Sequence, residues 1–399
     1  MAWPLVLAAI ASTPVFAATP KVEFYNYTNE SLFPSAIIGT ATVDWNDDFQ
    51  GAEDKKQEGD PAPEEGTLPV YGDENGWLGV VITDLADGAD VMVEISADDV
   101  LKPSTWRGKI KPGQGDVQIL PKLAWNFPAL LAVREERPLS ILVTATVNGK
   151  KVFNATETVV LTSINECPLY VLRDGDDVDD LKVVFAAYVN ENHPWIDGVL
   201  KDALETGVVD AFTGYQSGDP AEVVKQVYAV WCALQSRGIS YSDVSTSPPN
   251  KGVCSQAVRF LEESIEAGQA NCVDGSVMLA SILRKIGIHA YLVLVPGHCF
   301  LAFDLDDGGE EQFGLETTLI GSQSAEAPED LPEVLADLDS EELEIPHASF
   351  CLAVAVGNKT IAENQEGFDD DDDPVRQLIS VDAARERGIR PIASGRKRR

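Results

Sequence analysis

Apolar and polar residues alternate with a period of two along the first part of the chain. Segments such as DVMVEISA and SILVTATV are rich in β-branched residues and are bounded by turn residues. The dipeptide Asn148-Gly149 lies between two such segments and predicts a tight hairpin turn. Because residues 21–165 show several short strands and no helical period, we predict an immunoglobulin-like β-sandwich over residues 19–166.

A helical period replaces this alternation after Cys167-Pro168. The apolar residues of segment 220–239 repeat every three or four positions, Pro220 stands near its start, and Gly238 suits its C-terminal cap. A second helix is predicted over residues 255–268, and residues 271–320 show the pattern of one helix followed by three strands. Together these elements predict an α+β domain over residues 167–356.

The C-terminal part is predicted to be less regular. An acidic linker at residues 328–346 precedes a predicted strand, ASFCLAVAV, at residues 348–356. Residues 357–399 are predicted to form a solvated polar tail, because they contain a run of five aspartates at 369–373 and end in GRKRR. The pattern therefore predicts two folded domains flanked by two terminal segments.

The first terminal segment indicates export. Residues 3–18 are apolar but shorter than the roughly 20 residues that a membrane-spanning helix needs. Val15 and Ala17 suit a V-x-A cleavage site, although no basic residue precedes the apolar stretch. We therefore predict a signal peptide at residues 1–18 and an extracellular or periplasmic protein with no membrane association once the signal is removed. The alternative is a hydrophobic N-terminal strand that packs on the first domain.

The charge of the chain excludes one large class of partners. The sequence has 65 acidic and 30 basic residues, which give a formal net charge of −35. Such a surface repels phosphate backbones, so we predict no nucleic-acid partner. Solubility is the simplest role of this charge, which also suits a salt-rich or divalent-rich medium. The pattern does not indicate an oligomeric state.

The cysteines and aspartates do not form a metal motif. None of the six cysteines belongs to a C-x-x-C pair, which argues against a zinc ribbon or a redox motif. Two Asp-rich loops begin at Asp174 and Asp304, but Phe185 and Leu315 stand where an EF-hand needs its twelfth-position glutamate. We therefore predict no metal site and no cofactor, and whether the aspartate run at 369–373 attracts calcium stays open. Disulfide pairing of an exported chain stays open at this point.

One cysteine stands where its thiol is chemically activated. Cys272 follows Asn271, a preferred N-cap, and Asp274 supports the first turn of a helix that Gly287 ends. Cys272 is therefore expected in the first turn of this helix. The partial positive charge of a helix start favours the thiolate, which is the reactive form of the side chain.

A histidine and an acid follow on the predicted strands. His298 opens the strand HCFLAFDL, directly after a nearly continuous apolar strand. If the next hairpin folds about Asp307-Gly308, Glu316 comes opposite Cys299 and within one residue of His298. A carboxylate in that position would orient the imidazole. Asp304 is the alternative acid, although it lies six residues farther along the same strand.

The order of a cysteine at a helix start, then a histidine and an acid on neighbouring strands, resembles the transglutaminase-like superfamily. The matching text is NCVDGSVMLASILRKIGIHAYLVLVPGH at residues 271–298 and LETT at 315–318, with ISY and VRFLEESIEAGQA as a lead-in. The resemblance covers about residues 180–350. This chain departs from the family at Glu316, where the family usually has aspartate.

The resemblance implies a papain-like catalytic domain with Cys272 as nucleophile, His298 as its base and Glu316 as the orienting acid. We expect acyl transfer on protein or peptide amides through a thioester. The acceptor is either water, as in a protease or amidase, or an amine, as in a transamidase, and we favour water slightly because it is always present. The alternative is a non-catalytic extracellular binding or surface protein with this fold.

Acyl transfer also requires donors for the developing oxyanion. The backbone N–H of Cys272 is available at the helix start. Gln256 is a candidate side-chain donor, although an ordinary polar residue on the preceding predicted helix is the simpler interpretation.

Overall fold

The computed structural model describes residues 19–43, 68–173, 177–242, 252–336, 338, 343–370, 373 and 375–392. The chain divides into two compact units. The first contains Met1–Tyr27, Lys55–Trp125 and Ser140–Thr158, and the second contains Thr28–Asp54, Asn126–Leu139 and Val159–Arg399. The predicted signal peptide at residues 1–18 lies outside the described residues.

The predicted domain boundary at residue 166 is therefore too simple, because two early segments belong to the second unit. Helix α1 (Pro34–Gly39) packs closely there: a Cβ on Gly39 would lie 2.8 Å from the Cβ of Ala187. Ser35 Oγ also donates a hydrogen bond of 2.5 Å to the carbonyl oxygen of Glu166. These contacts join segments far apart in the chain, so a local pattern does not reveal them.

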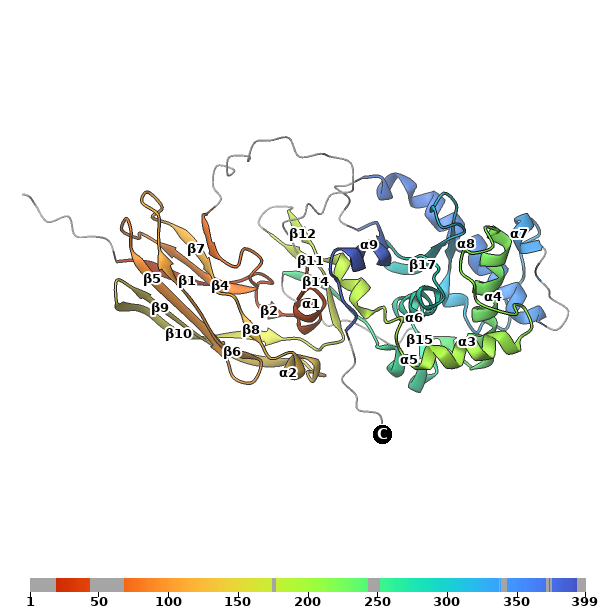
Figure 1. The fold of residues 1–399 in the computed structure, drawn as a ribbon, viewed down its shortest axis with the longest axis horizontal. Coiled ribbons are helices and arrows are strands. Elements are labelled where there is room, and N and C mark those ends of the chain that lie inside the picture. The colour runs from red at the N-terminus through yellow and green to blue at the C-terminus, as the bar shows by residue number, and fades with distance from the viewer. Residues whose placement is uncertain are drawn as a thin grey trace, which may run out of the picture. The chain divides into compact units, whose positions relative to one another are not determined.

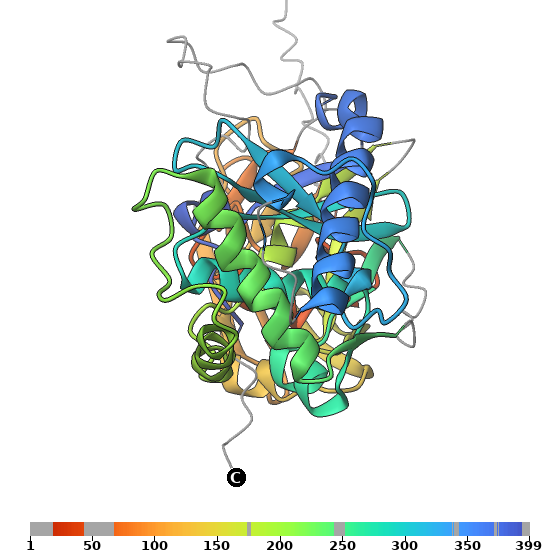
Figure 2. The ribbon, with the colours of Figure 1, turned by 90° about the vertical axis from the view of Figure 1, so that its right-hand side faces the viewer.

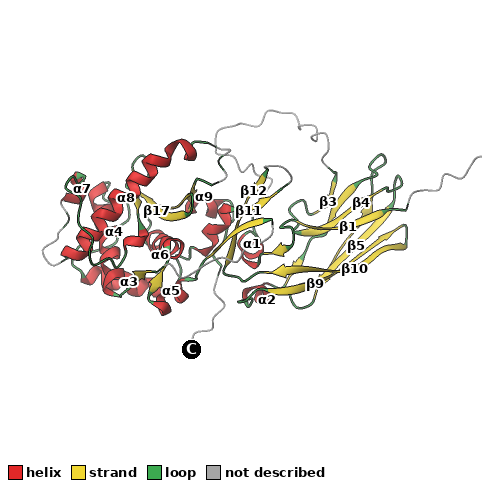
Figure 3. Cartoon of the chain, turned by 180° about the vertical axis from the view of Figure 1, so that it is seen from behind, coloured by secondary structure: helices red, strands yellow, loops and turns green. Residues whose placement is uncertain are grey.

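Two β-sheets make up the first unit, and Figures 1 and 3 show them as two layers. One sheet has the strand order β1-β4-β7-β3, and the other contains β10-β9-β5-β6-β8 in that order. Buried and less buried residues alternate along β5 and β9, as expected where one face of a sheet covers the core. The bounds are β1 Lys21–Asn26, β3 Val70–Gly72, β4 Leu78–Thr83, β5 Asp90–Ala97, β6 Leu101–Lys109, β7 Val117–Leu120, β8 Ala124–Trp125, β9 Arg137–Val147 and β10 Lys150–Leu161.

The predicted hairpin at Asn148-Gly149 is confirmed. It joins β9 and β10, which are neighbours in their sheet. Asn148 and Gly149 have φ values of 49° and 76°, and two consecutive positive φ angles are what a type I′ turn requires.

Helices gather in the second unit, as Figure 3 shows. Its helices are α1, α2 Phe127–Leu131, η1 Lys182–Tyr188, α3 Trp195–Glu205, α4 Pro220–Ser236, α5 Leu261–Ala267, α6 Cys272–Lys285, η2 Thr317–Leu319, α7 Glu333–Ala336, α8 Glu344–Phe368 and α9 Val381–Glu386. Its strands are β2 Ser31–Leu32, β11 Glu166–Leu172, β12 Val178–Asp180, β13 Ser240–Tyr241, β14 Val253–Ala257, β15 Gln269–Ala270, β16 Ala290–Val295, β17 His298–Asp304, β18 Gln312–Leu315 and β19 Gln377–Ser380. The predicted α4, and the predicted order of one helix and three strands after residue 270, are confirmed.

The core of this unit is a sheet with the strand order β18-β17-β16-β19. Helix α6 packs against β16 and β17. Ile361 and Phe368 of α8 pack against a buried cluster on the sheet formed by Val293, Val295, Phe300 and Ala302. Figure 2 shows the long helices α4 (green) and α8 (blue) side by side, and Trp231 Nε1 of α4 donates a 3.0 Å hydrogen bond to Ser349 Oγ of α8.

The prediction of a strand at residues 348–356 was wrong, because this segment lies inside α8. Phe350, Ala353, Val354 and Gly357 are buried along the helix at intervals of three and four residues. A short apolar run is compatible with either a strand or a buried helix, and only packing against α4 and β18 decides between them.

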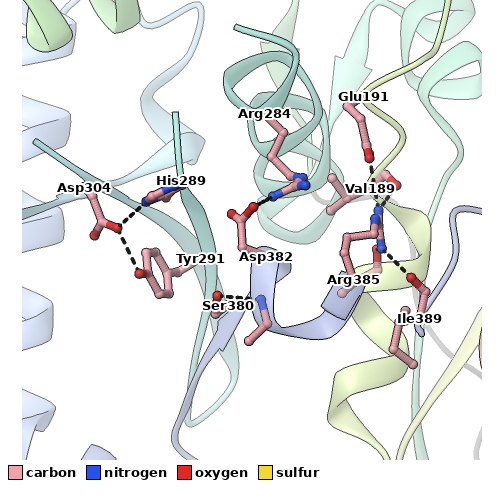
Figure 4. Close-up of polar contacts among 12 residues, drawn as sticks. Val189, Glu191, Arg284, His289, Tyr291, Asp304, Ser380, Asp382, Arg385 and Ile389 are labelled. Carbon is pink, nitrogen blue, oxygen red and sulfur yellow. Dashed lines mark hydrogen bonds and ion pairs between the residues drawn. The ribbon is translucent and has the colours of Figure 1, made fainter. Parts of the chain in front are cut away.

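The prediction of a solvated tail at 357–399 was also wrong for most of that segment. Helix α8 continues to Phe368, and β19 pairs antiparallel with β16. Arg385 of α9 forms an ion pair of 3.3 Å with Glu191, and Arg284 forms an ion pair with Asp382 (Figure 4). These long-range contacts hold a polar sequence against the folded unit, and composition alone does not show them.

Candidate active site

Cys272 is the first residue of helix α6, as the sequence predicted. Asn271 Oδ1 accepts a 2.8 Å hydrogen bond from the backbone N–H of Asp274, and the Asp274 carboxylate in turn accepts from the backbone N–H of Asn271. This reciprocal pair forms a capping box, which fixes where the helix begins. Burial raises the pKa of Asp274, although the backbone N–H groups of Arg259 and Asn271 donate to its carboxylate. The thiol of Cys272 is consequently held at the positive end of the helix.

Two hydroxyl groups fix the backbone of Cys272. Ser276 Oγ donates 2.7 Å to the carbonyl oxygen of Cys272, and Thr317 Oγ1 donates 3.2 Å to the same oxygen. Gly275 favours this approach, since a Cβ at that position would make a tight contact of 3.2 Å with the Thr317 side chain. The first turn of α6 is therefore tied to the residue that directly follows Glu316.

His298 and Glu316 form a short hydrogen-bonded pair. Nε2 of His298 lies 2.7 Å from Oε2 of Glu316. The other carboxylate oxygen of Glu316 accepts from the backbone N–H of Thr318 at 3.0 Å and from its hydroxyl at 2.6 Å. Glu316 is buried, with 8% of its side chain exposed, so these bonds hold the carboxylate in one orientation.

The strand register that brings Glu316 to His298 differs by one residue from the predicted register. Leu301 pairs with Leu315 in this antiparallel pair of strands. The next residue, Glu316, therefore lies opposite Phe300 and not opposite Cys299. The physical reason lies in the loop, where the carboxylate of Asp306 accepts from the backbone N–H groups at positions 308, 310 and 311. A one-residue slip in register moves a side chain to the other face of a sheet.

Both members of the pair have shifted pKa values. Hydrogen bonding to Cys272 and to Glu316 raises the pKa of His298 from 6.5 to about 10, against the opposing effect of burial. Burial by itself would raise the pKa of Glu316, but hydrogen bonds from His298 and Thr318 outweigh it and lower this pKa from 4.5. Since Glu316 occupies Nε2 of the imidazole, Nδ1 is the nitrogen left for the thiol of Cys272.

Asp304, the alternative acid of the sequence analysis, belongs to a different cluster. Its Oδ2 lies 3.2 Å from Nδ1 of His289 and accepts a 2.9 Å hydrogen bond from the hydroxyl of Tyr291, as Figure 4 shows. Gln312 Nε2 donates 3.1 Å to Oδ1 of the same carboxylate. Asp304 is 1% exposed and lies at the far end of β17, so the structure separates it from His298.

Cys272 and His298 open onto a cavity of about 260 Å³ within the second unit. One part of its wall comes from β11, η1 and β14, and another from β16, β17 and the turn between them. The described residues that line it are Leu169, Tyr170, Lys182, Phe185, Cys254, Ser255, Gln256, Cys272, Val273, Leu294, Val295, Gly297, His298, Cys299 and Val375.

Gln256 lies in this cavity wall, but not on a helix. The helix predicted over 255–268 is confirmed only for Leu261–Ala267, whereas Gln256 lies in β14 and pairs with Cys167 of β11. Its Nε2 donates 3.0 Å to the carbonyl oxygen of Ala257. The strand therefore brings an amide group to the same cavity as the thiol.

Three polar residues of the site were not identified from the sequence. Ser276 and Thr317 support the Cys272 backbone, and Lys182 reaches the cavity from η1. The LETT text contains Thr317 and was a usable signal, because it directly follows the proposed acid. Lys182 lies far from the motif in sequence, and nothing local indicates its position.

All six cysteines lie in the described part of the chain, and each is a free thiol. Among the described residues, no cluster of His, Cys, Asp and Glu side chains has three members placed to hold a metal ion. Of the helices in these described ranges, none is both long and apolar enough to cross a membrane. The chain matches no family model and no curated protein.

Proposed function

We propose that the second unit is a papain-like domain of transglutaminase-like type that transfers acyl groups from protein or peptide amides through a thioester on Cys272. The observation that carries this proposal is the 2.7 Å contact of His298 Nε2 with Glu316 Oε2, and the pKa of His298, raised by hydrogen bonding to Cys272 and Glu316, supports it. A nucleophile, a base and an orienting acid in that order form the arrangement that activates a thiol.

The proposed reaction begins with attack of the Cys272 sulfur on the amide carbonyl carbon. A sulfur–carbon bond forms, and the carbonyl oxygen becomes an oxyanion that the backbone N–H of Cys272 and the amide of Gln256 stabilise. The carbon–nitrogen bond then breaks, and the imidazolium of His298 gives its proton to the leaving amine. The pKa of about 10 supports this role, because it keeps the imidazole protonated at neutral pH.

Resolution of the thioester requires a second nucleophile. His298, now neutral, takes a proton from the attacking water, the carboxylic acid leaves, and the sulfur is released. Water is the acceptor that we favour over a lysine amine. The described residues that line the cavity include no aspartate and no glutamate, so none of them offers a carboxylate to bind a lysine ammonium.

The first unit, in this proposal, is an immunoglobulin-like sandwich that carries no part of the reaction. Its two sheets and its alternating burial support the architecture, and many unrelated functions use such sandwiches. We further propose an extracellular or periplasmic location, with a protein or peptide as substrate and no nucleic acid or membrane as partner. The formal net charge of −35 supports the exclusion of nucleic acid.

Alkylation of the native protein with iodoacetamide near neutral pH tests the proposal. Fast and selective labelling of Cys272, mapped by peptide mass spectrometry, is the expected result, because an imidazolium-paired thiol reacts as the thiolate. Cys254 is the internal control, since it lines the same cavity without a histidine partner among the lining residues. Labelling of Cys272 only after denaturant is added would favour the alternative, a non-catalytic binding or surface protein.

A further inference from the structure

The described residues that line the cavity beside Cys272 differ in charge from the chain as a whole. The sequence has 65 acidic residues against 30 basic ones, yet none of the described lining residues is acidic. The lining residues include instead Lys182 and His298, and hydrogen bonds to Cys272 and Glu316 raise the pKa of His298 to about 10. Two basic side chains therefore line the cavity, together with the cysteines Cys254, Cys272 and Cys299.

Lys182 is buried in a way that a surface lysine is not. Only 5% of its side chain is exposed, and it forms a 2.9 Å ion pair with Oδ2 of Asp180. The other carboxylate oxygen of Asp180 accepts from the backbone N–H of Lys182 at 2.7 Å, which fixes the start of η1. Lysine is almost never this buried unless it is paired, and the ion pair with Asp180 stabilises the ammonium in this buried position.

Lys182 is the member of this ion pair that lines the cavity. The side chain of Asp180 is 43% exposed, and Asp180 is not among the described residues that line the cavity. Asp180 offsets part of the charge of the ammonium, which is screened by salt less than a surface charge because it is buried. A bound anion in the cavity therefore interacts with Lys182 more strongly than with Asp180.

We infer that this cavity binds a carboxylate of the acyl-donor substrate, and that Lys182 is the residue that selects it. The inference rests on the proposed function, and it adds the class of substrate: an acidic peptide or a peptide with a free terminal carboxylate. Leu169, Phe185 and Val375 supply an apolar wall for the rest of the substrate. The volume of about 260 Å³ lies just below the range of roughly 300–1,000 Å³ for ligand pockets, so the cavity suits a short segment.

Two alkylating reagents of similar size test the charge of the cavity without any turnover. Iodoacetate is anionic and iodoacetamide is neutral, and both form a sulfur–carbon bond with Cys272 as iodide leaves. Measurement of both rate constants gives a ratio that depends on charge near the thiol. We expect Lys182→Met to lower the iodoacetate-to-iodoacetamide ratio by about threefold or more, because it removes a poorly screened positive charge.

Two further variants control this measurement. Lys182→Arg keeps the charge and should keep most of the ratio. Lys285→Met removes the same charge from the last turn of α6, about 20 Å along the helix from Cys272, and should leave the ratio unchanged. Near-UV circular dichroism checks that each variant is folded. An unchanged ratio in folded Lys182→Met protein overturns the inference.

Four matched peptides identify the source of the carboxylate. Each has either Glu or Gln next to the scissile amide, and either a free or an amidated C-terminus. A higher kcat/KM for Glu assigns the subsite to an acidic side chain, whereas a higher kcat/KM for the free terminus assigns it to a terminal carboxylate. Lys182→Met should abolish whichever preference the wild type shows. Equal kcat/KM values for all four peptides overturn the inference.

The two experiments separate failure of this inference from failure of the proposed function. If no peptide is turned over but the alkylation ratio still depends on Lys182, the thioester chemistry is rejected and the anion-binding cavity is retained. If peptides are turned over without any dependence on Lys182, the chemistry is retained and the carboxylate subsite is rejected.

Discussion

Glu316 Oε2 lies 2.7 Å from His298 Nε2, although Glu316 stands one position beyond the last paired residue of β18. The pairing of Leu301 with Leu315 puts Glu316 opposite Phe300, on the same face of the sheet as His298. Had Glu316 stood opposite Cys299, its side chain would point to the other face. The hydrogen-bonded loop around Asp306 therefore determines which carboxylate reaches the histidine.

Helix α8 fixes the backbone of Glu316 and of the strand that precedes it. The backbone N–H of Glu316 donates 3.0 Å to the carbonyl oxygen of Ala353, and the N–H of Gly314 donates 2.7 Å to Asn358 Oδ1. Gly314 and Gly357 let the strand and the helix approach backbone to backbone, because a Cβ on Gly357 would lie 2.4 Å from the carbonyl carbon of Gly314. The orientation of Glu316 thus depends on a helix that carries no part of the proposed chemistry.

Substitutions in the proposed triad should reduce activity in a defined order. Cys272→Ala should abolish acyl transfer, and His298→Ala should lower kcat/KM about 10²–10⁴-fold and also slow alkylation of Cys272 at neutral pH. Glu316→Gln should cost less than either, because the shape of the side chain is kept while the charge is lost. The activity of each of the three variants is measured as the release of new carboxyl and amino groups from a peptide substrate.

Cys232→Ala is the matched control for the triad variants, since it removes a buried thiol of the same unit that is not among the described residues lining the cavity. It should retain activity. Near-UV circular dichroism must show that every variant is folded. Full activity of Cys272→Ala would disprove the catalytic role, and a silent Glu316→Gln would remove Glu316 from the triad.

Gly357→Ala should destabilise the second unit by about 2–3 kcal/mol, because the added methyl group meets backbone atoms that cannot move aside. Thermal or urea unfolding measures the change. Gly198→Ala in α3 is the control, where the nearest atoms belong to the flexible end of Arg237 at 3.1 Å. Equal stability of the two variants would contradict the close backbone approach of α8 and β18.

Asp304→Asn should reduce stability and leave the chemistry intact. The carboxylate is 1% exposed and bonds to His289, Tyr291 and Gln312, so loss of its charge should cost about 1–3 kcal/mol. The kcat/KM of the folded protein should stay close to that of the wild type. A large loss of kcat in a fully folded Asp304→Asn variant would show that the acid was assigned to the wrong residue.

The stabilising effect of the His298–Glu316 pair should depend on pH. The pKa of His298 is raised from 6.5 to about 10, so its contribution to stability is complete below about 6.5 and is lost as the pH rises toward 10. The pKa of Glu316 is lowered from 4.5, so its contribution is lost as the pH falls below that value. The Tm difference between wild type and Glu316→Gln should therefore be largest near pH 6 and shrink toward pH 10. A difference that stays constant over this range would contradict the ion pair.

Local signals in the sequence determined several elements of this protein. The capping box of Asn271 and Asp274, the type I′ turn at Asn148-Gly149 and the amphipathic period of α4 are all short-range features, so each was predicted correctly. The position of Cys272 at a helix start followed from the same local chemistry. Such features depend on residues within one or two turns of each other, and the sequence contains all of that information.

Only the tertiary structure decided the strand register that brings Glu316 to His298, which segments join the second unit, and which charged residues line the cavity. Glu316 reaches the histidine through a hairpin register and the packing of α8, and Lys182 comes from a segment about ninety residues before Cys272. The apolar run at 348–356 became a helix because α4 and β18 pack against it. Contacts between distant segments depend on packing of the whole unit, and no local period in the sequence carries that information.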